Sequence, residues 1–457
     1  MRNFKIFLLL ALVVQAAVFT RAAETNLLVW QADRGNVSAD IRSEALWPLL
    51  EDIAHQTGWH IFVEPGASQN ASVKFKNVPV GEALRKLLGN LNYALVPETN
   101  GPDQLYVFTT KMQNATQPVQ LVKPVAKKQR HVANELLVKL KPGADINAIA
   151  KTLGAVVTGR YDKLGIYQLQ FPDAAATDAA LASLQTNPDV AAVDYNYIFD
   201  APPAPQQIAS APPVGPVALT LDASTPSDPC NPVVGLIDTQ MQSLGSQLDP
   251  FLMKAINVTG DTTTASTTVP THATAMAQTI LRAVSQQSSS SSVRILPVNV
   301  YGASETATSW NVALGVQAAV DGGATVLNMS LGGTTDGAVL ENIIQQALAQ
   351  GIVVFASAGN QPVSTPTYPA AIPGVNAVTA LGAPGQLASY ANYGSFVDMA
   401  LPGSSLIYLG NQAWVVQGTS PATAYATGVA AGTKGVNCLP WAQIQSAMAA
   451  KFPVPQQ

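Results

Sequence analysis

Short apolar runs alternate with longer helical stretches between residues 229 and about 452, and this alternation most narrows what the chain can fold into. Such alternation is typical of parallel strands joined by helices in an α/β domain. In an open α/β sheet, functional groups gather where the strands end. The strands are predicted at 233–237, 293–300, 324–329, 352–356 and 375–381, and the helices at 310–320, 337–350 and from 420 onward.

The composition fits a buried core with an uncharged polar surface. Of 457 residues, 47% are hydrophobic and only 11% are charged, and the net charge is −4. A chain without a basic excess offers no electrostatic basis for binding nucleic acid.

Residues 1–23 are predicted to be a secretory signal peptide, with Arg2 and Lys5 before an apolar stretch and small residues at the cleavage point. The alternative is a membrane anchor, but the stretch is shorter than the ~20 residues that a spanning helix needs. Export makes a disulfide between Cys230 and Cys438 plausible, the alternative being two unpaired thiols. Two cysteines so far apart predict no metal site.

The chain before the α/β domain divides into two small α+β units. Residues 24–110 contain two helical patterns and several short strands, and residues 111–130 form a polar linker. Residues 131–200 follow a β-α-β-β-α-β order, which predicts a ferredoxin-like sandwich. Residues 201–228 are rich in proline, so they are predicted to be extended and open to cleavage by this chain or another enzyme.

Two segments in these units resemble known families. Val73–Leu88 resembles the short N-terminal domain of secretins and TonB-dependent receptors. That resemblance implies docking to an envelope protein of a Gram-negative bacterium; the alternative is an unrelated α+β domain. Asn187–Asn196 is similar to the end of subtilase propeptides, which implies a domain that assists folding and inhibits the protease until it is removed.

Three residues in the α/β domain stand in the order of one known Ser-His-Asp hydrolase arrangement. Asp238 follows the apolar run 233–237, His272 opens a run of small residues, and Ser420 opens a helix. Each has a plainer alternative, since Asp238 could cap a strand, His272 could begin a helix without a further role, and Ser420 could be an N-cap. Asn360 could be a turn residue.

Six strings make the resemblance to subtilisin-like serine proteases (subtilases) specific, because they occur in the family's order and at similar spacing. It implies that Ser420 is the nucleophile, His272 the base, Asp238 the residue that orients it, and Asn360 a donor to the oxyanion. The strings are Gly235–Thr239, His272–Thr274, Asn328–Gly333, Ala356–Asn360, Tyr368–Ala370 and Gly418–Ala422.

The same resemblance predicts where an extended substrate binds. Ser330–Gly333 would be an edge that pairs with the substrate backbone. Together with Ala356–Gly359, it would line the pocket for the side chain before the scissile bond. Neither string has an acidic residue, so a strict preference for Arg or Lys is not expected; the alternative is a plain strand-to-helix turn. The residues are Ser330, Leu331, Gly332, Gly333, Ala356, Ser357, Ala358 and Gly359.

Several neighbours of these residues depart from the family. These departures do not change the four site residues, but they bear on the geometry of the site and on its catalytic efficiency. Calcium is implied by the family resemblance alone, and no calcium site can be assigned from the residues. The departures are Gln240, Ala273, Ala275, Ala424 and Tyr425.

The sequence therefore predicts an exported serine endopeptidase that acts on polypeptides and is made as a precursor inhibited by its own propeptide. Its expected fold is a subtilisin-like parallel-sheet domain, residues 229–457, preceded by two small α+β domains. It is expected in the periplasm, at the outer membrane or outside a Gram-negative cell. The alternative is an inactive subtilase-fold binding protein of the envelope. An esterase is a weaker alternative, because no Gly-x-Ser-x-Gly surrounds Ser420.

Overall fold

A computed structural model shows two compact units, residues 1–123 with 456–457 and residues 124–455. The predicted signal peptide lies outside the described residues, and so do parts of both linkers. Among the described residues no helix is long and apolar enough to cross a membrane. The structure describes residues 27–31, 36–97, 103–119, 130–208, 219–224, 230–261, 268–382, 385–410 and 412–455.

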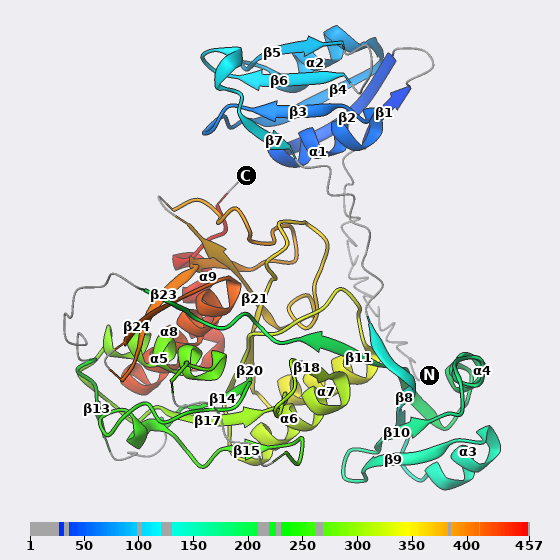
Figure 1. Cartoon of the computed structure of the whole chain (residues 1–457), viewed down its shortest axis with the longest axis vertical. Helices are drawn as coiled ribbons and strands as arrows, with labels where there is room; N and C mark the ends of the chain where they lie inside the picture. The colour runs from blue at the N-terminus through cyan, green and yellow to red at the C-terminus, as the bar shows by residue number, and fades with distance from the viewer. Residues whose placement is uncertain are drawn as a thin grey trace, which may run out of the picture. The chain divides into compact units, whose positions relative to one another are not determined.

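The first unit packs two helices and two small sheets around one core (Figure 1). One sheet has the order β1-β2-β4 and the other β5-β6-β3-β7. Leucines of both helices, at Leu49, Leu50, Leu84, Leu87 and Leu88, are buried in that core. The elements are β1 (Leu27–Gln31), β2 (Asn36–Ala45), α1 (Leu46–Thr57), β3 (His60–Val63), β4 (Asn70–Pro79), α2 (Val80–Leu88), β5 (Asn92–Val96), β6 (Gln104–Phe108), η1 (Met112–Asn114) and β7 (Gln117–Val119).

This unit contains strands near both ends that the sequence does not predict, and its last elements lie beyond the predicted boundary at residue 110. β1 and β2 were not predicted, because β2 is built of small and polar residues that become a strand by pairing with β4. β7 lies in the segment expected to be linker, and it pairs antiparallel with β3. Three residues with no periodicity carry no strand signal of their own, so only tertiary pairing defines them.

The region that we call the sandwich region, residues 130–200, begins the second unit. Its strands have the order β11-β8-β10-β9, which in chain order is 4-1-3-2, with two helices on one face. Asp145 and Asp173 cap the helix starts, accepting N–H groups of Asn147 and Ala176 at 2.8 Å. The elements are β8 (His131–Leu140), α3 (Ile146–Leu153), β9 (Val156–Tyr161), β10 (Ile166–Gln170), α4 (Ala174–Gln185) and β11 (Val190–Asp200).

The region that we call the α/β domain, residues 230–455, is built on a parallel sheet of seven strands in the order β15-β17-β14-β19-β20-β21-β22. The predicted α/β class with a parallel sheet is confirmed. β14 lies inside the sheet, and its carboxyl end is Asp238. The strands are β14 (Val233–Asp238), β15 (Ile256–Asn257), β17 (Arg294–Asn299), β19 (Val326–Met329), β20 (Val353–Ser357), β21 (Asn376–Leu381) and β22 (Met399–Pro402).

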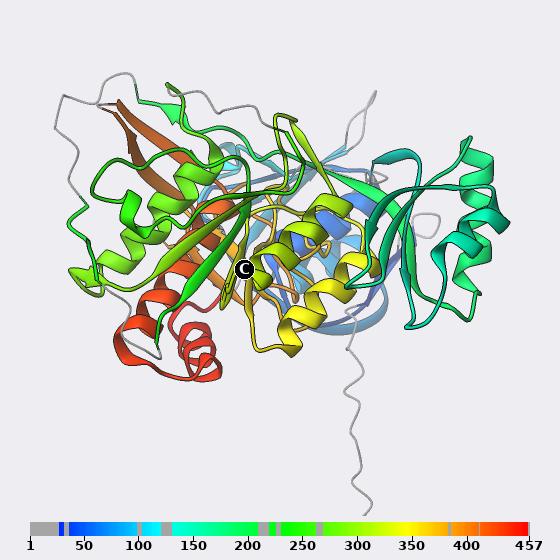
Figure 2. The same ribbon diagram turned by 90° about the horizontal axis from the view of Figure 1, so that it is seen from below.

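Helices cover both faces of this sheet. α5 (His272–Ser285) and α8 (Thr419–Asn437) share one hydrophobic core with the sheet, and α6 (Ser309–Asp321) and α7 (Ala338–Ala349) share another. Along β14, Val234 and Leu236 point into the first core and Ile237 into the second. Figure 2 shows α6 and α7 beside the sandwich region, which puts the second core between the sheet and that region.

Smaller elements complete the domain. β23 (Ser404–Leu409) and β24 (Gln412–Gln417) form an antiparallel hairpin, and β12 (Gln206–Gln207) adds to its edge. None of these strands was predicted, although β23 and β24 each contain four consecutive apolar residues, at 406–409 and 413–416. The remaining elements are β13 (Asp222–Ala223), η2 (Asp249–Phe251), β16 (Ser290–Ser291), β18 (Thr306–Thr308) and α9 (Trp441–Lys451).

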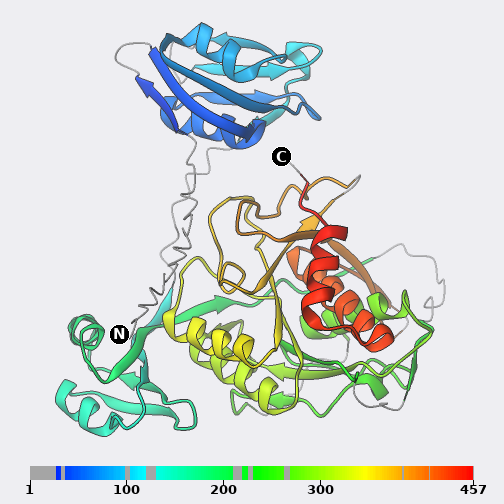
Figure 3. The same cartoon turned by 180° about the vertical axis from the view of Figure 1, so that it is seen from behind.

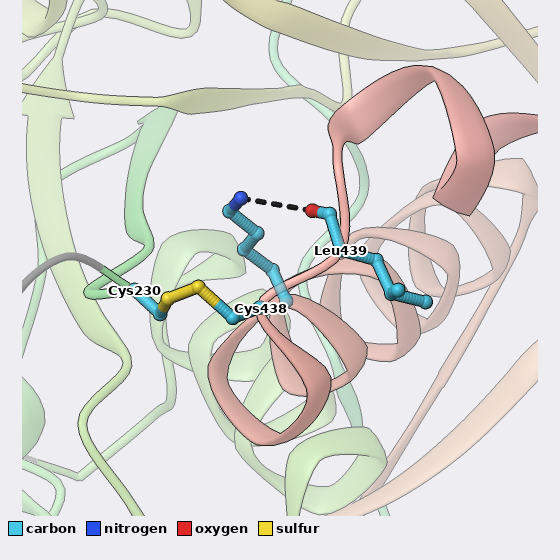
Figure 4. The surroundings of a disulfide bond; sticks show 4 residues. Cys230, Cys438 and Leu439 are labelled. Carbon is cyan, nitrogen blue, oxygen red and sulfur yellow. Dashed lines mark hydrogen bonds between the residues drawn. A yellow bond between two sulfur atoms is a disulfide. The ribbon is translucent and has the colours of Figure 1, made fainter.

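Cys230 and Cys438 form a disulfide that joins the chain just before β14 to the end of α8 (Figure 4). Beside it, the Lys434 ammonium donates to the carbonyl oxygen of Leu439 at 2.8 Å. The start of the α/β domain is thus tied covalently to the helix that carries Ser420.

Candidate active site

Asp238 and His272 form a buried, directed pair. The Nδ1 atom of His272 lies 2.9 Å from each carboxylate oxygen of Asp238. Only 1% of Asp238 and 3% of His272 are exposed, so water does not compete for this contact. Because the carboxylate faces Nδ1, the Nδ1–H tautomer is favoured and Nε2 is left to accept a proton.

The first turn of α5 is fastened to the loop after β14. Thr271 caps the helix, its hydroxyl accepting the Thr274 N–H at 3.2 Å. The Ala273 N–H donates to the Thr239 hydroxyl at 3.0 Å, one residue past Asp238. Gln242 accepts the Thr271 N–H at 2.8 Å and donates its own backbone N–H to the Thr274 hydroxyl at 3.2 Å. These bonds fix the start of the helix that holds His272.

Close packing sets α5 and α8 side by side and in the same direction. A Cβ on Gly428 would lie 2.4 Å from the carbonyl oxygen of Ile280, and one on Gly432 would lie 2.4 Å from the Gln287 side chain. Ile280 is two turns beyond His272, and Gly428 is equally far beyond Ser420. His272 and Ser420 therefore lie at the same end of two adjacent helices, each in its first turn.

Ser420 is buried, with 6% of its surface exposed, and its backbone is tied to the end of β19. The Ser330 hydroxyl donates to the Ser420 carbonyl oxygen at 3.4 Å. Asn328 donates to the Ser330 hydroxyl at 3.1 Å and accepts from Thr427 of α8 at 3.0 Å. Among the described residues, no hydrogen bond joins Ser420 Oγ to the ring of His272, so their relation rests on the helix packing.

Asn360 lies against the start of α8. Its Oδ1 accepts the Thr419 N–H at 2.8 Å and the Thr419 hydroxyl at 3.0 Å, which leaves its Nδ2 as a donor. The approach is close, because a Cβ on Gly418, whose φ is 143°, would lie 3.0 Å from that Nδ2. The N–H groups of a first helical turn have no partner within the helix, so the Ser420 N–H is a second donor beside Asn360.

The two predicted substrate-binding strings are joined through the chain around Tyr368. Gly333 and Tyr368 exchange two backbone hydrogen bonds of 2.9 and 2.8 Å. The Thr367 hydroxyl donates to the Ala358 carbonyl oxygen at 2.6 Å. Ser330–Gly333 thus follows β19, and Ala356–Gly359 begins in the last two residues of the neighbouring strand β20, at the same edge of the sheet as Asp238.

Four of the five residues that depart from the family pattern are packed or hydrogen-bonded between α5, α8 and the sheet. Ala273, Ala275 and Ala424 are fully buried in the core shared by α5, α8 and the sheet. Tyr425 hydrogen-bonds to Gln286, so it joins α8 to the end of α5. None of these contacts disturbs the Asp238–His272 pair.

Sequence reasoning missed four residues that shape the site. Thr419, Asn328 and Thr427 hold Ser420 and Asn360 in place, and Gln242 holds the start of α5. Thr419 and Asn328 lie inside two of the six strings that resemble the family, and this was the available signal. Thr427 and Gln242 act through contacts distant in sequence, and nothing in their surroundings marks them.

Within the described ranges, no group of three or more His, Cys, Asp or Glu side chains is placed to bind a metal ion. Calcium is also bound by backbone and amide oxygens, so it stays an expectation of the family resemblance.

The sandwich region contacts the α/β domain at the starts of α6 and α7. Asp194 accepts the Val339 N–H at 2.8 Å, capping a helix whose own N-cap, Gly337, has no side chain. Asn196 accepts the Trp310 N–H at 3.1 Å at the start of α6. Burial raises the pKa of Asp194 to about 7, although the N–H groups of α7 partly oppose this.

The last three residues of β11 form an interface that the sequence did not predict. They pair antiparallel with β18, and this pairing carries β11 to Asp200, past the predicted end at residue 197. Phe199 is buried in the core of the α/β domain together with Leu331 and Leu340.

Comparison with known families agrees with both parts of this unit. Residues 230–452 match the Subtilase family, and residues 117–196 match the Fervidolysin N-terminal prodomain. The second match begins in β7, before the sandwich region.

Known relatives match only part of the chain. The thermophilic serine proteinase of Bacillus sp. (strain AK1) is 38% identical over 140 residues, which cover 30% of this chain and 35% of that protein. Thermitase of Thermoactinomyces vulgaris is 38% identical over 138 residues, or 30% of this chain and 50% of that one. The chain thus spans at most half the length of these two relatives.

One solved structure supports the fold across both regions. Fervidolysin from Fervidobacterium pennivorans, described as a keratinolytic enzyme related to subtilisin, has a TM-score of 0.55 at 18% identity. The match covers 72% of this chain and 62% of fervidolysin. At this identity the likeness concerns the fold alone.

Proposed function

We propose that the chain is a serine endopeptidase made as an inhibited precursor, because residues 230–452 match the Subtilase family and residues 117–196 match the Fervidolysin N-terminal prodomain. The observation that carries the proposal is the buried Asp238–His272 pair, with both carboxylate oxygens 2.9 Å from Nδ1. His272 is in the first turn of α5, and Ser420 is in the first turn of α8, the parallel helix beside it.

In the proposed reaction, Ser420 Oγ attacks the peptide carbonyl carbon and His272 Nε2 takes its proton. The tetrahedral intermediate then breaks its C–N bond, and His272 returns the proton to the leaving amine. Water, activated by the same imidazole, hydrolyses the acyl-enzyme. Asp238 holds the tautomer and stabilises the imidazolium.

The proposed oxyanion hole has two donors, the Nδ2 of Asn360 and the backbone N–H of Ser420. Supporting this role, the Asn360 oxygen is occupied by Thr419 and its side chain is exposed, so its amide group is free to meet a substrate. Preorganised donors of this kind stabilise charge that develops only in the transition state.

Ser330–Gly333 and Ala356–Gly359 are proposed to hold the substrate, the first as an edge that adds the substrate strand and the second as a pocket wall. Small, uncharged residues in both strings support a pocket without a preference for basic side chains. The natural substrates are polypeptides of unspecified sequence.

The sandwich region is proposed to be the inhibitory propeptide. Its caps on α6 and α7 and the insertion of Phe199 support this role, because they hold the region against the α/β domain. Export is supported by the disulfide, which forms in oxidising compartments. The first unit is proposed to dock to an envelope protein, supported only by the sequence resemblance.

A fluorophosphonate probe tests the proposal, since it reacts only with an activated serine. The full chain and a sample whose sandwich region has been digested with trypsin are incubated with the probe. We expect the digested sample to be labelled at Ser420, and Ser420→Ala and His272→Ala samples to stay unlabelled. A digested, folded wild-type sample without label would favour the inactive binding protein instead.

A further inference from the structure

The proposed oxyanion donor, Asn360, lies on the exposed loop that follows β20. Thr419 holds its side-chain oxygen, but a bond at the end of a side chain does not fix the backbone that carries it. The residue before it, Gly359, has a φ of 108°, a conformation that favours glycine. The direction of the Asn360 side chain therefore depends on what holds the chain around it.

Asn392, in the segment between β21 and β22, binds the residues on both sides of Asn360. Its backbone N–H donates to the Gly359 carbonyl oxygen at 3.0 Å. Its side-chain Oδ1 accepts the Gln361 N–H at 2.8 Å. One residue therefore holds the chain immediately before and immediately after the proposed donor.

The side chain of Asn392 also packs against Gly359. A Cβ at residue 359 would lie 2.5 Å from Asn392 Nδ2 and 3.1 Å from its Cγ. The amide group has room there only because residue 359 has no side chain. Packing and hydrogen bonding together set the distance between the two segments.

Asn392 is itself fixed by the parallel sheet. Only 1% of it is exposed, and its carbonyl oxygen accepts the hydroxyl of Thr379, a fully buried residue of β21, at 2.5 Å. β20 and β21 are parallel neighbours, so the segments that follow them leave the same edge of the sheet. Figures 1 and 3 both show these segments, in gold and orange, as loops at one end of the α/β domain. The sheet thus holds the loop of Asn360 through Asn392.

The two hydrogen bonds of Asn392 depend differently on its side chain. Every residue except proline supplies the N–H that bonds to Gly359, whereas the bond to Gln361 needs an acceptor on a side chain of this length. Without that acceptor the Gln361 N–H, on an exposed loop, bonds to water, and the chain after Asn360 is free to shift. An oxyanion donor stabilises the transition state only when it is preorganised, and a displacement of about 1 Å can cost 10²-fold in rate.

We propose that Asn392 is a positioning residue for the hydrolysis of peptide bonds. It holds the backbone on both sides of Asn360, so that Nδ2 of Asn360 is directed at the place where the oxyanion forms. Asn392 acts through Asn360 and carries no proton in the reaction. This inference rests on the proposed function, and it adds the residue that orients one of the two oxyanion donors.

The test measures kcat and KM of Asn392→Ala after the sandwich region has been digested and the trypsin removed. The substrate is a peptide p-nitroanilide with an uncharged residue before the anilide. The value of kcat is expressed per serine labelled by the fluorophosphonate probe, so that unfolded chains are not counted. We expect kcat to fall about 10-fold and KM to change less than about 2-fold, since only the transition state loses stabilisation.

Asn376→Ala is the matched control. Asn376 is also buried, and its Nδ2 donates to the Val354 carbonyl oxygen at 2.9 Å, at the start of β21 rather than at the end that leads to Asn392. Its loss should lower the resistance to denaturant as Asn392→Ala does, but leave kcat unchanged. Asn392→Ser, whose side chain is too short to reach Gln361, should lose kcat like Asn392→Ala, so the test does not depend on the folding of one variant.

A double-mutant cycle with Asn360→Ala separates positioning from a general structural role. If Asn392 acts through Asn360, then Asn392→Ala should lower kcat less than about 2-fold in a chain that already lacks the Asn360 amide. A full 10-fold loss in that chain would overturn the inference. So would a KM of Asn392→Ala that rises as much as kcat falls, because the substrate site would then be disturbed instead.

The inference and the proposed function fail in different ways. If the trypsin-treated wild-type protein does not react with the probe, the proposed function is wrong and the inference falls with it. If that protein reacts and hydrolyses the anilide, but Asn392→Ala loses no more kcat than Asn376→Ala, only the inference is wrong.

Discussion

Gly428 of α8 lies directly against the carbonyl oxygen of Ile280 of α5, so that a Cβ at residue 428 would be 2.4 Å from that oxygen. The contact is with backbone, which has no rotamer to move out of the way. It sets the separation of the two helices that begin with His272 and Thr419–Ser420.

Gly428→Ala should therefore push the helices apart. We expect the free energy of unfolding to fall by about 1–3 kcal/mol, as for other overpacked cores. We expect kcat/KM to fall more, because a displacement of about 1 Å at the reacting groups can cost 10²-fold. Gly435→Ala on the same helix is the control, since its Cβ would meet atoms no closer than 3.8 Å. Equal activity of both variants would show that this contact does not position Ser420.

Thr419 orients Asn360, so its hydroxyl should matter for kcat although it carries no proposed chemistry. Thr419→Val loses the bond to Asn360 Oδ1 and leaves the Gly359 N–H, now 3.2 Å from that hydroxyl, without its acceptor. We expect kcat to fall about 10-fold, less than the 10²–10³ found for a subtilisin when the oxyanion-hole asparagine is removed. Thr419→Ser keeps the hydroxyl and should retain most activity, with KM little changed in both. A Val variant with normal kcat would contradict this role.

The interface at Asp194 should make the precursor more stable in mild acid. Burial raises the pKa of Asp194 from 3.8 to about 7, with the charge of Asp336 adding to the effect. The folded chain then binds a proton that the unfolded chain releases, so this stability is complete below about pH 4 and is lost as the pH rises through 7.

Denaturant unfolding of the Ser420→Ala chain, which prevents self-digestion, measures this effect. Between pH 5 and pH 8 the chain with Asp194 should lose more stability than the same chain with Asp194→Asn. Asp336 and Glu341 also have raised pKa values, but they are present in both chains and cancel in the comparison. Identical pH dependence of the two chains would rule out a titration at Asp194.

The disulfide should stabilise the α/β domain. Replacing Cys230 and Cys438 by Ala is expected to lower the free energy of unfolding by about 2–5 kcal/mol, as is usual when a native disulfide is lost. Dithiothreitol should have the same effect on the wild-type protein and none on the variant. If the reductant leaves the wild-type unfolding curve unchanged, the bond does not contribute to stability.

The α/β domain could be predicted because its central strands are continuous apolar runs. The run before Asp238 is buried on both faces of the sheet and is apolar along its length, so its sequence alone indicates a buried strand. β24 does not, because its apolar run, residues 413–416, is only four residues long and it lies in a hairpin outside the parallel sheet. It is also the strand that β12 pairs with, so this pairing could not be predicted either.

The four site residues could be named from local strings, but their arrangement could not. Asp238 and His272 each stand at the boundary of a secondary-structure element that the sequence marks. The position of His272 relative to Ser420 along the two helices depends on the contact between Gly428 and Ile280. No periodicity in the sequence predicts that contact. Likewise, the cap that Asp194 places on α7 comes from a strand more than 140 residues earlier in the chain, where an aspartate in a strand looks unremarkable.

The bridge between Cys230 and Cys438 has a consequence for maturation. Any scission between Ile208 and Cys230 creates a fresh amino terminus only a short way ahead of β14. The disulfide joins Cys230 to Cys438 at the end of α8, so β14 remains anchored at its start after such a cut. Asp238, at the carboxyl end of β14, then keeps its position beside His272. The precursor can thus shed its leading segments without loosening the strand on which the imidazole depends.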